Sequence, residues 1–161
     1  MLGVLYRTGQ HLAKIKGSLY PLMRNEPLVI IDDDLHDLHA MQRTVLAMGL
    51  TREVIVFDNA VMALDFIRRS IPVPIAIICR IDNRFFSGFQ LRAAILGMED
   101  CPARRAPFIF FSRSYTWESI GQASELEVHA VFRKTGNETE LRDNLQAIFG
   151  LLLGTGDWNL D

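Results

Sequence analysis

Three consecutive carboxylates, Asp32, Asp33 and Asp34, follow directly on the apolar run of residues 28–31. An apolar run favours burial, whereas clustered carboxylates disfavour one another's ionised form unless a cation or water lies nearby. A metal ion, a basic side chain and solvent are the three candidates for neutralising this cluster. The chemistry of these residues therefore depends on which other side chains the fold brings beside them.

Arg80, Ser112 and Lys134 also stand at the ends of short runs rich in apolar and β-branched residues, which are typical of strands. Because the carboxyl ends of parallel strands meet at one edge of an open sheet, where ligands bind, we expect these side chains to face Asp32 and Asp33. The predicted strands are residues 28–31, 53–57, 74–79, 107–112 and 129–133.

A stretch of helical periodicity follows each predicted strand, which gives five β-α units. Strands such as IAIIC and FIFF are apolar at successive positions, as expected for a parallel sheet covered by helices on both faces. The sequence therefore predicts an α/β fold of three layers. The buried stripes of the first and last helices are predicted to be Leu38, Met41, Val45 and Met48, and Leu141, Leu145, Ile148 and Leu152.

With these residues in place, the chain from about 27 to 152 resembles the receiver domain of bacterial two-component response regulators. The resemblance rests on Asp32 and Asp33, on SGFQL at the start of the third helix, on Ser112 and on Lys134. It implies a flavodoxin-like fold with a five-stranded parallel sheet of order 2-1-3-4-5. It also implies that Asp32 and Asp33 are metal-binding acids, that the Ser112 hydroxyl senses a phosphoryl group and that Lys134 pairs with phosphate.

The sequence departs from this family at the residue that should accept the phosphoryl group. The family's spacing places the acceptor aspartate eight residues before Gly88, and that residue here is Arg80. Arg84 and Thr135 replace two prolines of the family, and Val131 stands at the position of its switch aromatic. The resemblance is therefore to a degenerate receiver, or pseudo-receiver.

Arg80 also supplies an answer to how the acidic cluster is neutralised. A guanidinium is always protonated and binds carboxylates in a two-pronged geometry. Asp32 and Asp33 against Arg80 and Lys134 give a neutral site, so no cofactor is predicted and Mg²⁺ is not expected. If Mg²⁺ does bind, Asp32 and Asp33 are its predicted ligands.

Asp82 carries the main alternative. Sliding the third strand by two residues would make Asp82 the acceptor of a functional receiver that binds Mg²⁺ at Asp32 and Asp33. A third reading is an unrelated flavodoxin-like nucleotide binder, but no Gly-rich phosphate loop follows the first strand.

Several polar residues have simpler structural explanations. Asp34 is predicted to be the N-cap of the first helix, with Asp37 in the capping-box position three residues later. His36, His39 and His129 have no carboxylate or thiol neighbour at convincing ligand spacing, so we interpret them as solvated or capping residues.

The composition excludes several classes of protein. The 161 residues are 49% hydrophobic, enough for one sizeable core, and 17 Lys and Arg against 19 Asp and Glu offer no basic excess for nucleic acid. Cys79 and Cys101 form no CxxC pair, which favours a reducing compartment. No apolar stretch has the length of a membrane span or a signal peptide, so we expect a cytoplasmic protein with no membrane partner.

The predicted domain covers residues 26–153, between an extension of residues 1–25 and a tail of residues 154–161. We expect the extension to be poorly ordered, with a partner-binding helix as the alternative. Its apolar residues at loosely helical spacing are Leu5, Leu12, Ile15 and Leu19.

These observations together predict a stand-alone pseudo-receiver of bacterial signal transduction that is not an enzyme and acts through protein contacts without phosphorylation. The predicted partners are a histidine kinase, another regulator or a second copy of the chain in a homodimer. In receivers the partner surface is commonly formed by helix four, strand five and helix five. Trp117, early in the fourth predicted helix, is the candidate anchor on that surface.

Overall fold

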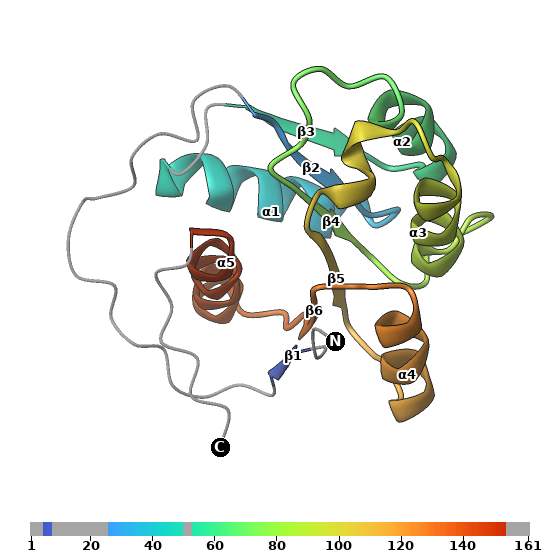
Figure 1. Ribbon diagram of the computed structural model, residues 1–161. Helices are drawn as coiled ribbons and strands as arrows, with labels where there is room; N and C mark the ends of the chain where they lie inside the picture. Colours follow the sequence, from blue (N-terminus) through green and yellow to red (C-terminus); the bar gives the residue numbers. More distant parts are fainter. Residues whose placement is uncertain (1–4, 8–25, 50–52, 154–161) are drawn as a thin grey trace.

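A six-stranded parallel sheet forms the centre of the computed structural model, which describes residues 5–7, 26–49 and 53–153 (Figure 1). Five of the strands lie close to the predicted bounds, and from β3 to β6 they run in the predicted order 2-1-3-4-5. The predicted flavodoxin-like fold is therefore confirmed. These five strands are β2 (Leu28–Ile31), β3 (Val54–Phe57), β4 (Ala76–Cys79), β5 (Phe108–Ser112) and β6 (Ala130–Arg133).

The sixth strand, β1 (Leu5–Arg7), was not predicted. It pairs in parallel with the outer edge of β6, with Leu5 opposite Ala130 and Arg7 opposite Phe132. The expectation of a poorly ordered or helical segment is wrong for these three residues, because a strand this short has no sequence periodicity and is held by its pairing with β6. Leu12, Ile15, Leu19 and the tail lie outside the described residues.

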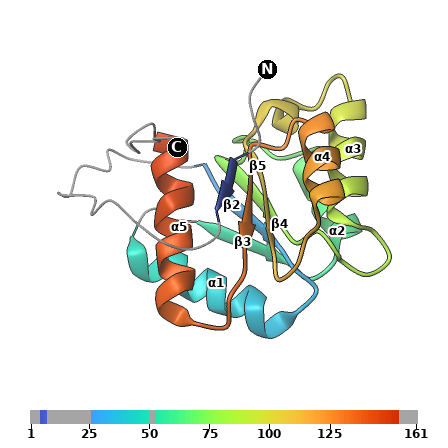
Figure 2. The same ribbon diagram turned by 90° about the horizontal axis from the view of Figure 1, so that it is seen from below.

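Two layers of helices cover the sheet (Figure 2). One face carries α1 (Leu35–Met48) and α5 (Glu138–Leu153), and the predicted stripes of both helices are buried or partly buried against it. The other face carries α2 (Ala60–Ile67), α3 (Gly88–Gly97) and α4 (Trp117–Glu125). A short 3₁₀ helix, η1 (Pro102–Arg105), joins α3 to β5. Among the described residues no helix is long and apolar enough to cross a membrane.

Local sequence signals fix where the helices beside the acidic edge begin. Asp34 is the N-cap of α1, as predicted, and its carboxylate accepts from the backbone N–H groups of His36 and Asp37. Ser87 caps α3 in a reciprocal capping box with Gln90. These caps place both helix N-termini at the carboxyl edge of the sheet.

Gly88, the first residue of α3, lies against the loop that carries Arg80. A Cβ at Gly88 would stand 2.6 Å from the carbonyl oxygen of Arg80 and 2.6 Å from an edge carbon of the Phe110 ring. The first is a backbone atom and the second belongs to a fully buried ring, so neither can move without cost. A glycine at this position is therefore required for the close approach of α3 to the end of β4.

We expect Gly88→Ala to lower the free energy of unfolding by about 1–3 kcal/mol, because overpacking forces backbone shifts. Gly97→Ala, in the last turn of the same helix, is the matched control: its Cβ would meet nothing within 4 Å. That variant should gain roughly 0.4–1 kcal/mol from a less flexible unfolded chain. Urea denaturation measures both, and equal stabilities would contradict the packing argument.

Candidate functional site at the carboxyl edge of the sheet

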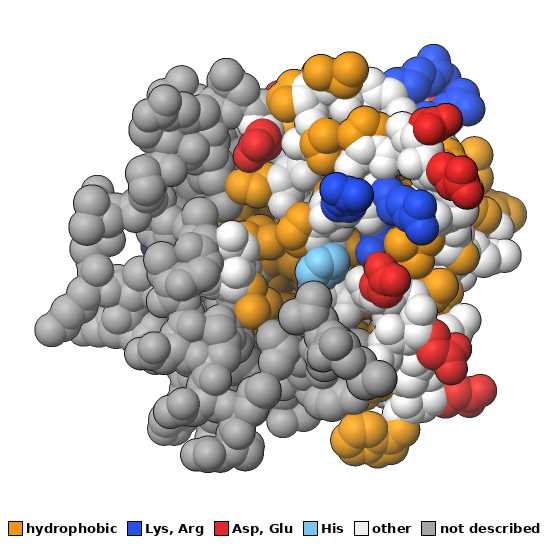
Figure 3. All heavy atoms as spheres, viewed as in Figure 1, with side chains coloured by type: hydrophobic (Ala, Val, Ile, Leu, Met, Phe, Trp, Pro, Cys, Tyr) orange, Lys and Arg blue, Asp and Glu red, His pale blue; other side chains and the backbone are white. Residues whose placement is uncertain are grey.

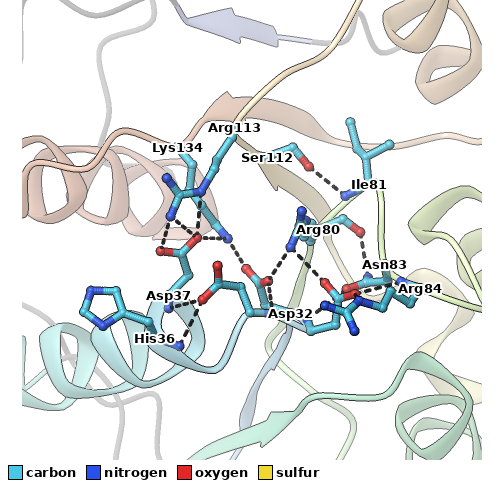
Figure 4. A network of polar contacts seen from close by, with 12 residues as sticks. Asp32, His36, Asp37, Arg80, Ile81, Asn83, Arg84, Ser112, Arg113 and Lys134 are labelled. Carbon is cyan, nitrogen blue, oxygen red and sulfur yellow. Dashed lines mark hydrogen bonds and ion pairs between the residues drawn. The ribbon is translucent and has the colours of Figure 1, made fainter.

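The parallel register brings the predicted site residues to one edge of the sheet. Ile31 lies opposite Cys79 in the pairing of β2 with β4, so the next residues, Asp32 and Arg80, emerge side by side. Ser112 ends β5 and Lys134 follows β6 beside it, where its backbone N–H donates to the Ser112 carbonyl at 2.8 Å. Figure 4 shows these four side chains together.

Arg80 is the cation that faces the acidic cluster. Its Nη1 donates to Asp33 Oδ1 at 2.8 Å and lies 3.5 Å from Asp32 Oδ1. The Arg80 side chain is 27% exposed, so this contact is partly shielded from water. Of the three means of neutralisation that the sequence leaves open, this structure shows a basic side chain in contact with the cluster.

Asp32 and Lys134 form the buried part of the site. The Asp32 side chain is fully buried, and its Oδ2 forms an ion pair with Nζ of Lys134, which is itself only 4% exposed. Burial raises the pKa of the Asp32 carboxyl above its ordinary value, and Lys134 and Arg80 act in the opposite direction. The two cations therefore offset the desolvation of a carboxylate that has no access to water.

Asp37 and Arg113 extend the network beyond the predicted residues. The capping-box role predicted for Asp37 is wrong: its carboxylate instead lies 3.1 Å from Nζ of Lys134 and accepts from Arg113 at 2.8 to 3.1 Å. Arg113 directly follows Ser112 at the end of β5, which is the positional signal that would have identified it. Three carboxylates, Asp32, Asp33 and Asp37, thus face Arg80, Lys134 and Arg113, and the exposed Arg84 side chain also lies 3.6 Å from Asp33.

The Ser112 hydroxyl is turned toward the loop after β4. Its Oγ accepts from the backbone N–H of Ile81 at 2.7 Å, and the residue is 1% exposed. Asn83 holds the same loop, because its amide nitrogen donates to the Arg80 carbonyl at 2.8 Å and its oxygen accepts from the Asp33 N–H. Sequence reasoning missed Asn83, since only the turn of the loop brings it back to the site.

Asp82 and Arg84 lie on the outer part of this loop. Arg80 N–H donates to the Ile31 carbonyl at 2.9 Å, so Arg80 directly continues β4, and Asp82 stands two residues farther on with an exposed side chain. The Arg84 side chain is 80% exposed, and its backbone N–H donates to Asp33 Oδ2 at 2.9 Å. The strand slide that would align Asp82 with Asp32 is therefore absent from this structure.

The donor set of this edge does not fit a resident Mg²⁺ ion. Both carboxylate oxygens of Asp32 and both of Asp33 already accept from N–H groups or contact a cation. Arg80 stands at the position from which a third carboxylate would complete the oxygen-rich site that Mg²⁺ prefers. Within the described ranges there is no group of three or more His, Cys, Asp or Glu side chains that could hold a metal ion.

Comparison with known proteins agrees with this fold. No family model and no curated protein matches the sequence. Among solved structures, the phosphorylated cyanobacterial phytochrome response regulator RcpA has a TM-score of 0.72 at 18% identity, with 83% of this chain and 97% of that chain covered. The Vibrio cholerae chemotaxis protein CheY4 has a TM-score of 0.65 at 16% identity, covering 77% and 98%.

A third similar structure is the receiver domain of the sensor histidine kinase PA1611 from Pseudomonas aeruginosa, which holds a magnesium ion in its active site cleft. Its TM-score is 0.65 at 15% identity, and the match covers 81% of this chain and 98% of that chain. At these identities the likeness establishes the fold alone. This chain therefore has the fold of response regulator receiver domains.

We expect Arg80→Ala to lower the free energy of unfolding by about 1–2 kcal/mol, because it leaves Asp33 and the buried Asp32 with less compensating charge at a site that water reaches in part. Arg84→Ala is the matched control, because it removes an exposed ion pair with the same carboxylate, at 3.6 Å, and keeps the backbone N–H bond to Asp33. Exposed ion pairs contribute little, so this variant should change stability by less than about 0.5 kcal/mol. Chemical denaturation measures the free energy of unfolding of both variants. An equal loss of stability in the two would mean that Arg80 is not the specific counter-ion.

Proposed function

We propose that this chain is a receiver-type module of two-component signal transduction that acts through protein contacts, without phosphorylation and without catalytic activity of its own. The observation that carries the proposal is the Arg80 guanidinium, which continues β4 beside Asp32 and binds Asp33 at 2.8 Å. The receiver fold supplies the signalling context.

Phosphorylation of a carboxylate begins with its nucleophilic attack on phosphorus, and the attacking group must be an accessible anion. Arg80 carries a fixed positive charge and cannot perform this step. Asp32 is buried and paired with Lys134, and Asp33 is held by Arg80 and by the Arg84 N–H. The carboxylates beside Arg80 are therefore poor substitutes for a free acceptor.

Permanent ion pairs also make the carboxyl edge of the sheet unsuited to act as a switch. A phosphorylated receiver gains and loses charge, whereas here the cations Arg80, Lys134 and Arg113 are supplied by the chain itself. The Ser112 hydroxyl accepts a hydrogen bond from the Ile81 N–H at 2.7 Å, and this contact anchors the loop that follows β4. We infer that the edge is a fixed structural element and that the signal is carried by binding of a histidine kinase, another regulator or a second copy.

Incubation of the purified protein with acetyl phosphate and Mg²⁺ is expected to give no covalent phosphate, as measured by intact mass. A stable mass increase of one phosphoryl group would overturn the proposal. Asp82→Asn is included in the same assay, because loss of that increase in this variant would assign Asp82 as the acceptor.

Arg80→Asp provides the positive control. A third carboxylate beside Asp32 and Asp33 recreates an oxygen-rich site, so millimolar Mg²⁺ should raise the melting temperature of this variant by preferential binding to the folded state. The wild type and Arg80→Ala should not respond. An equal response of all three proteins to Mg²⁺ would show that the arginine does not control metal binding.

The proposed partner surface is the side of the molecule formed by α4, β6 and α5. Trp117 is the first residue of α4 and is 81% exposed, as the sequence predicts. β1 lies along the outer edge of β6, between α4 and α5 (Figures 1 and 2), so the backbone edge of β6 is already paired. A partner at this surface would therefore meet side chains and the β1 strand rather than a free β6 edge.

We expect Trp117→Ala to weaken self-association, measured by sedimentation velocity, and binding to a cognate histidine kinase, because exposed aromatic residues are frequent interface anchors. Leu46→Ala on α1 is the matched control, since Leu46 is an exposed apolar residue, at 47%, on a helix that belongs to a different surface. If Trp117→Ala leaves both interactions unchanged while its melting temperature matches the wild type, this surface assignment fails.

A further inference from the structure

A polar hollow lies at the opposite end of the sheet from Asp32 and Arg80. It has a volume of about 830 Å³ and lies between the end of α3, η1 and the turn that leads into β6. Figure 3 faces it: blue side chains and a pale-blue histidine gather near the middle of the view, with red side chains beside them. Its arginine, carboxylate and histidine lining residues are Arg92, Glu99, Asp100, Arg104, Arg105, Glu127 and His129.

Arg92 places a buried positive charge in the wall of this hollow. The residue is 1% exposed, and its guanidinium donates to the backbone carbonyls of Leu126, Arg104 and Glu127 at 3.0 to 3.3 Å. No carboxylate within the described part of the chain forms an ion pair with it. Burial lowers the pKa of Arg92, and the nearby Glu127 carboxylate acts in the opposite direction without forming an ion pair. The wall therefore favours a negative charge nearby.

His129 lines the same hollow and carries an N–H donor. Its Nδ1 accepts from the backbone N–H of Phe108 at 3.1 Å, which in the neutral ring leaves the proton on Nε2. Burial, followed by the charge of Arg92, lowers the pKa of His129. The residue thus lines the hollow as a neutral ring that can donate one hydrogen bond.

Arg104 and Arg105 add two exposed guanidinium groups from η1. Three carboxylates, Glu99, Asp100 and Glu127, line the same hollow, yet the described residues show no ion pair between them and either arginine. Elsewhere in this chain, exposed arginines do form ion pairs with carboxylates, as Arg113 does with Asp37. The side chains of Arg104 and Arg105 therefore remain available to a ligand.

We propose that this hollow binds a small anion through a phosphate group, with Arg104, Arg105 and the Nε2–H of His129 as donors and the buried Arg92 as a fixed positive charge. Guanidinium groups match phosphate in geometry as well as charge, because two parallel N–H groups reach two oxygens. The carboxylates in the same lining repel long polyanions, so the site selects a single phosphate group rather than nucleic acid. This proposal is independent of Arg80 and of the proposed function.

The test uses the full chain labelled with ¹⁵N and titrated with sodium phosphate at constant ionic strength, with chloride as the reference salt. Saturable amide shifts at millimolar phosphate are expected in residues 99–105 and 127–129 and absent from the edge that carries Asp32. Adenosine monophosphate forms a second arm: tighter binding than phosphate supports a phosphomonoester ligand, and equal binding supports phosphate itself.

Arg104→Gln and Arg105→Gln should each weaken binding by about tenfold, since each removes a charge-assisted hydrogen bond. Arg105→Lys, which keeps the charge, should lose less. Arg43→Gln is the matched control, because Arg43 is an exposed arginine on α1, on the other face of the sheet. Absence of saturable shifts, shifts spread over the whole surface, or equal weakening by Arg43→Gln would overturn the proposal.

Discussion

A carboxylate with no access to water, that of Asp32, is the constraint on which the rest of the acidic edge depends. Removing an ionised group from water is costly unless opposite charge and hydrogen bonds replace the lost solvent. Lys134 supplies the direct partner, Arg80 the second cation, and the Asp34 N–H a further hydrogen bond. These groups follow β2, β4 and β6. The buried Asp32 carboxylate therefore holds together the segments that leave the carboxyl ends of three strands.

The same arrangement supplies this edge with positive charge from the chain itself. The kinase receiver from Pseudomonas aeruginosa holds a magnesium ion in its cleft, whereas here the guanidinium of Arg80 provides positive charge beside Asp32 and Asp33. A covalently attached cation cannot dissociate. In our proposal the edge has therefore changed from a responsive site into a permanent part of the scaffold, and binding surfaces carry the function.

The buried charged groups at the two ends of the sheet have different kinds of partner. At the carboxyl edge Asp32 is matched by full ionic partners, whereas Arg92 at the opposite end is satisfied by three backbone carbonyls and by the face of the Phe108 ring. Carbonyl groups hold a guanidinium in place without neutralising it. In our proposal a bound phosphate group adds negative charge at this second end.

The sequence by itself determined the five principal strands and the convergence of Asp32, Asp33, Arg80, Ser112 and Lys134, because parallel strands bring their carboxyl ends to one edge of the sheet. The order of the strands followed from the resemblance to receiver domains. Only the tertiary structure decided the rest. Asp37 turns from its own helix to Lys134 and Arg113, Asn83 folds back onto Asp33, and β1 pairs with β6. Each of these contacts joins residues that are distant in the chain or in a loop without periodicity, so no local pattern encodes them.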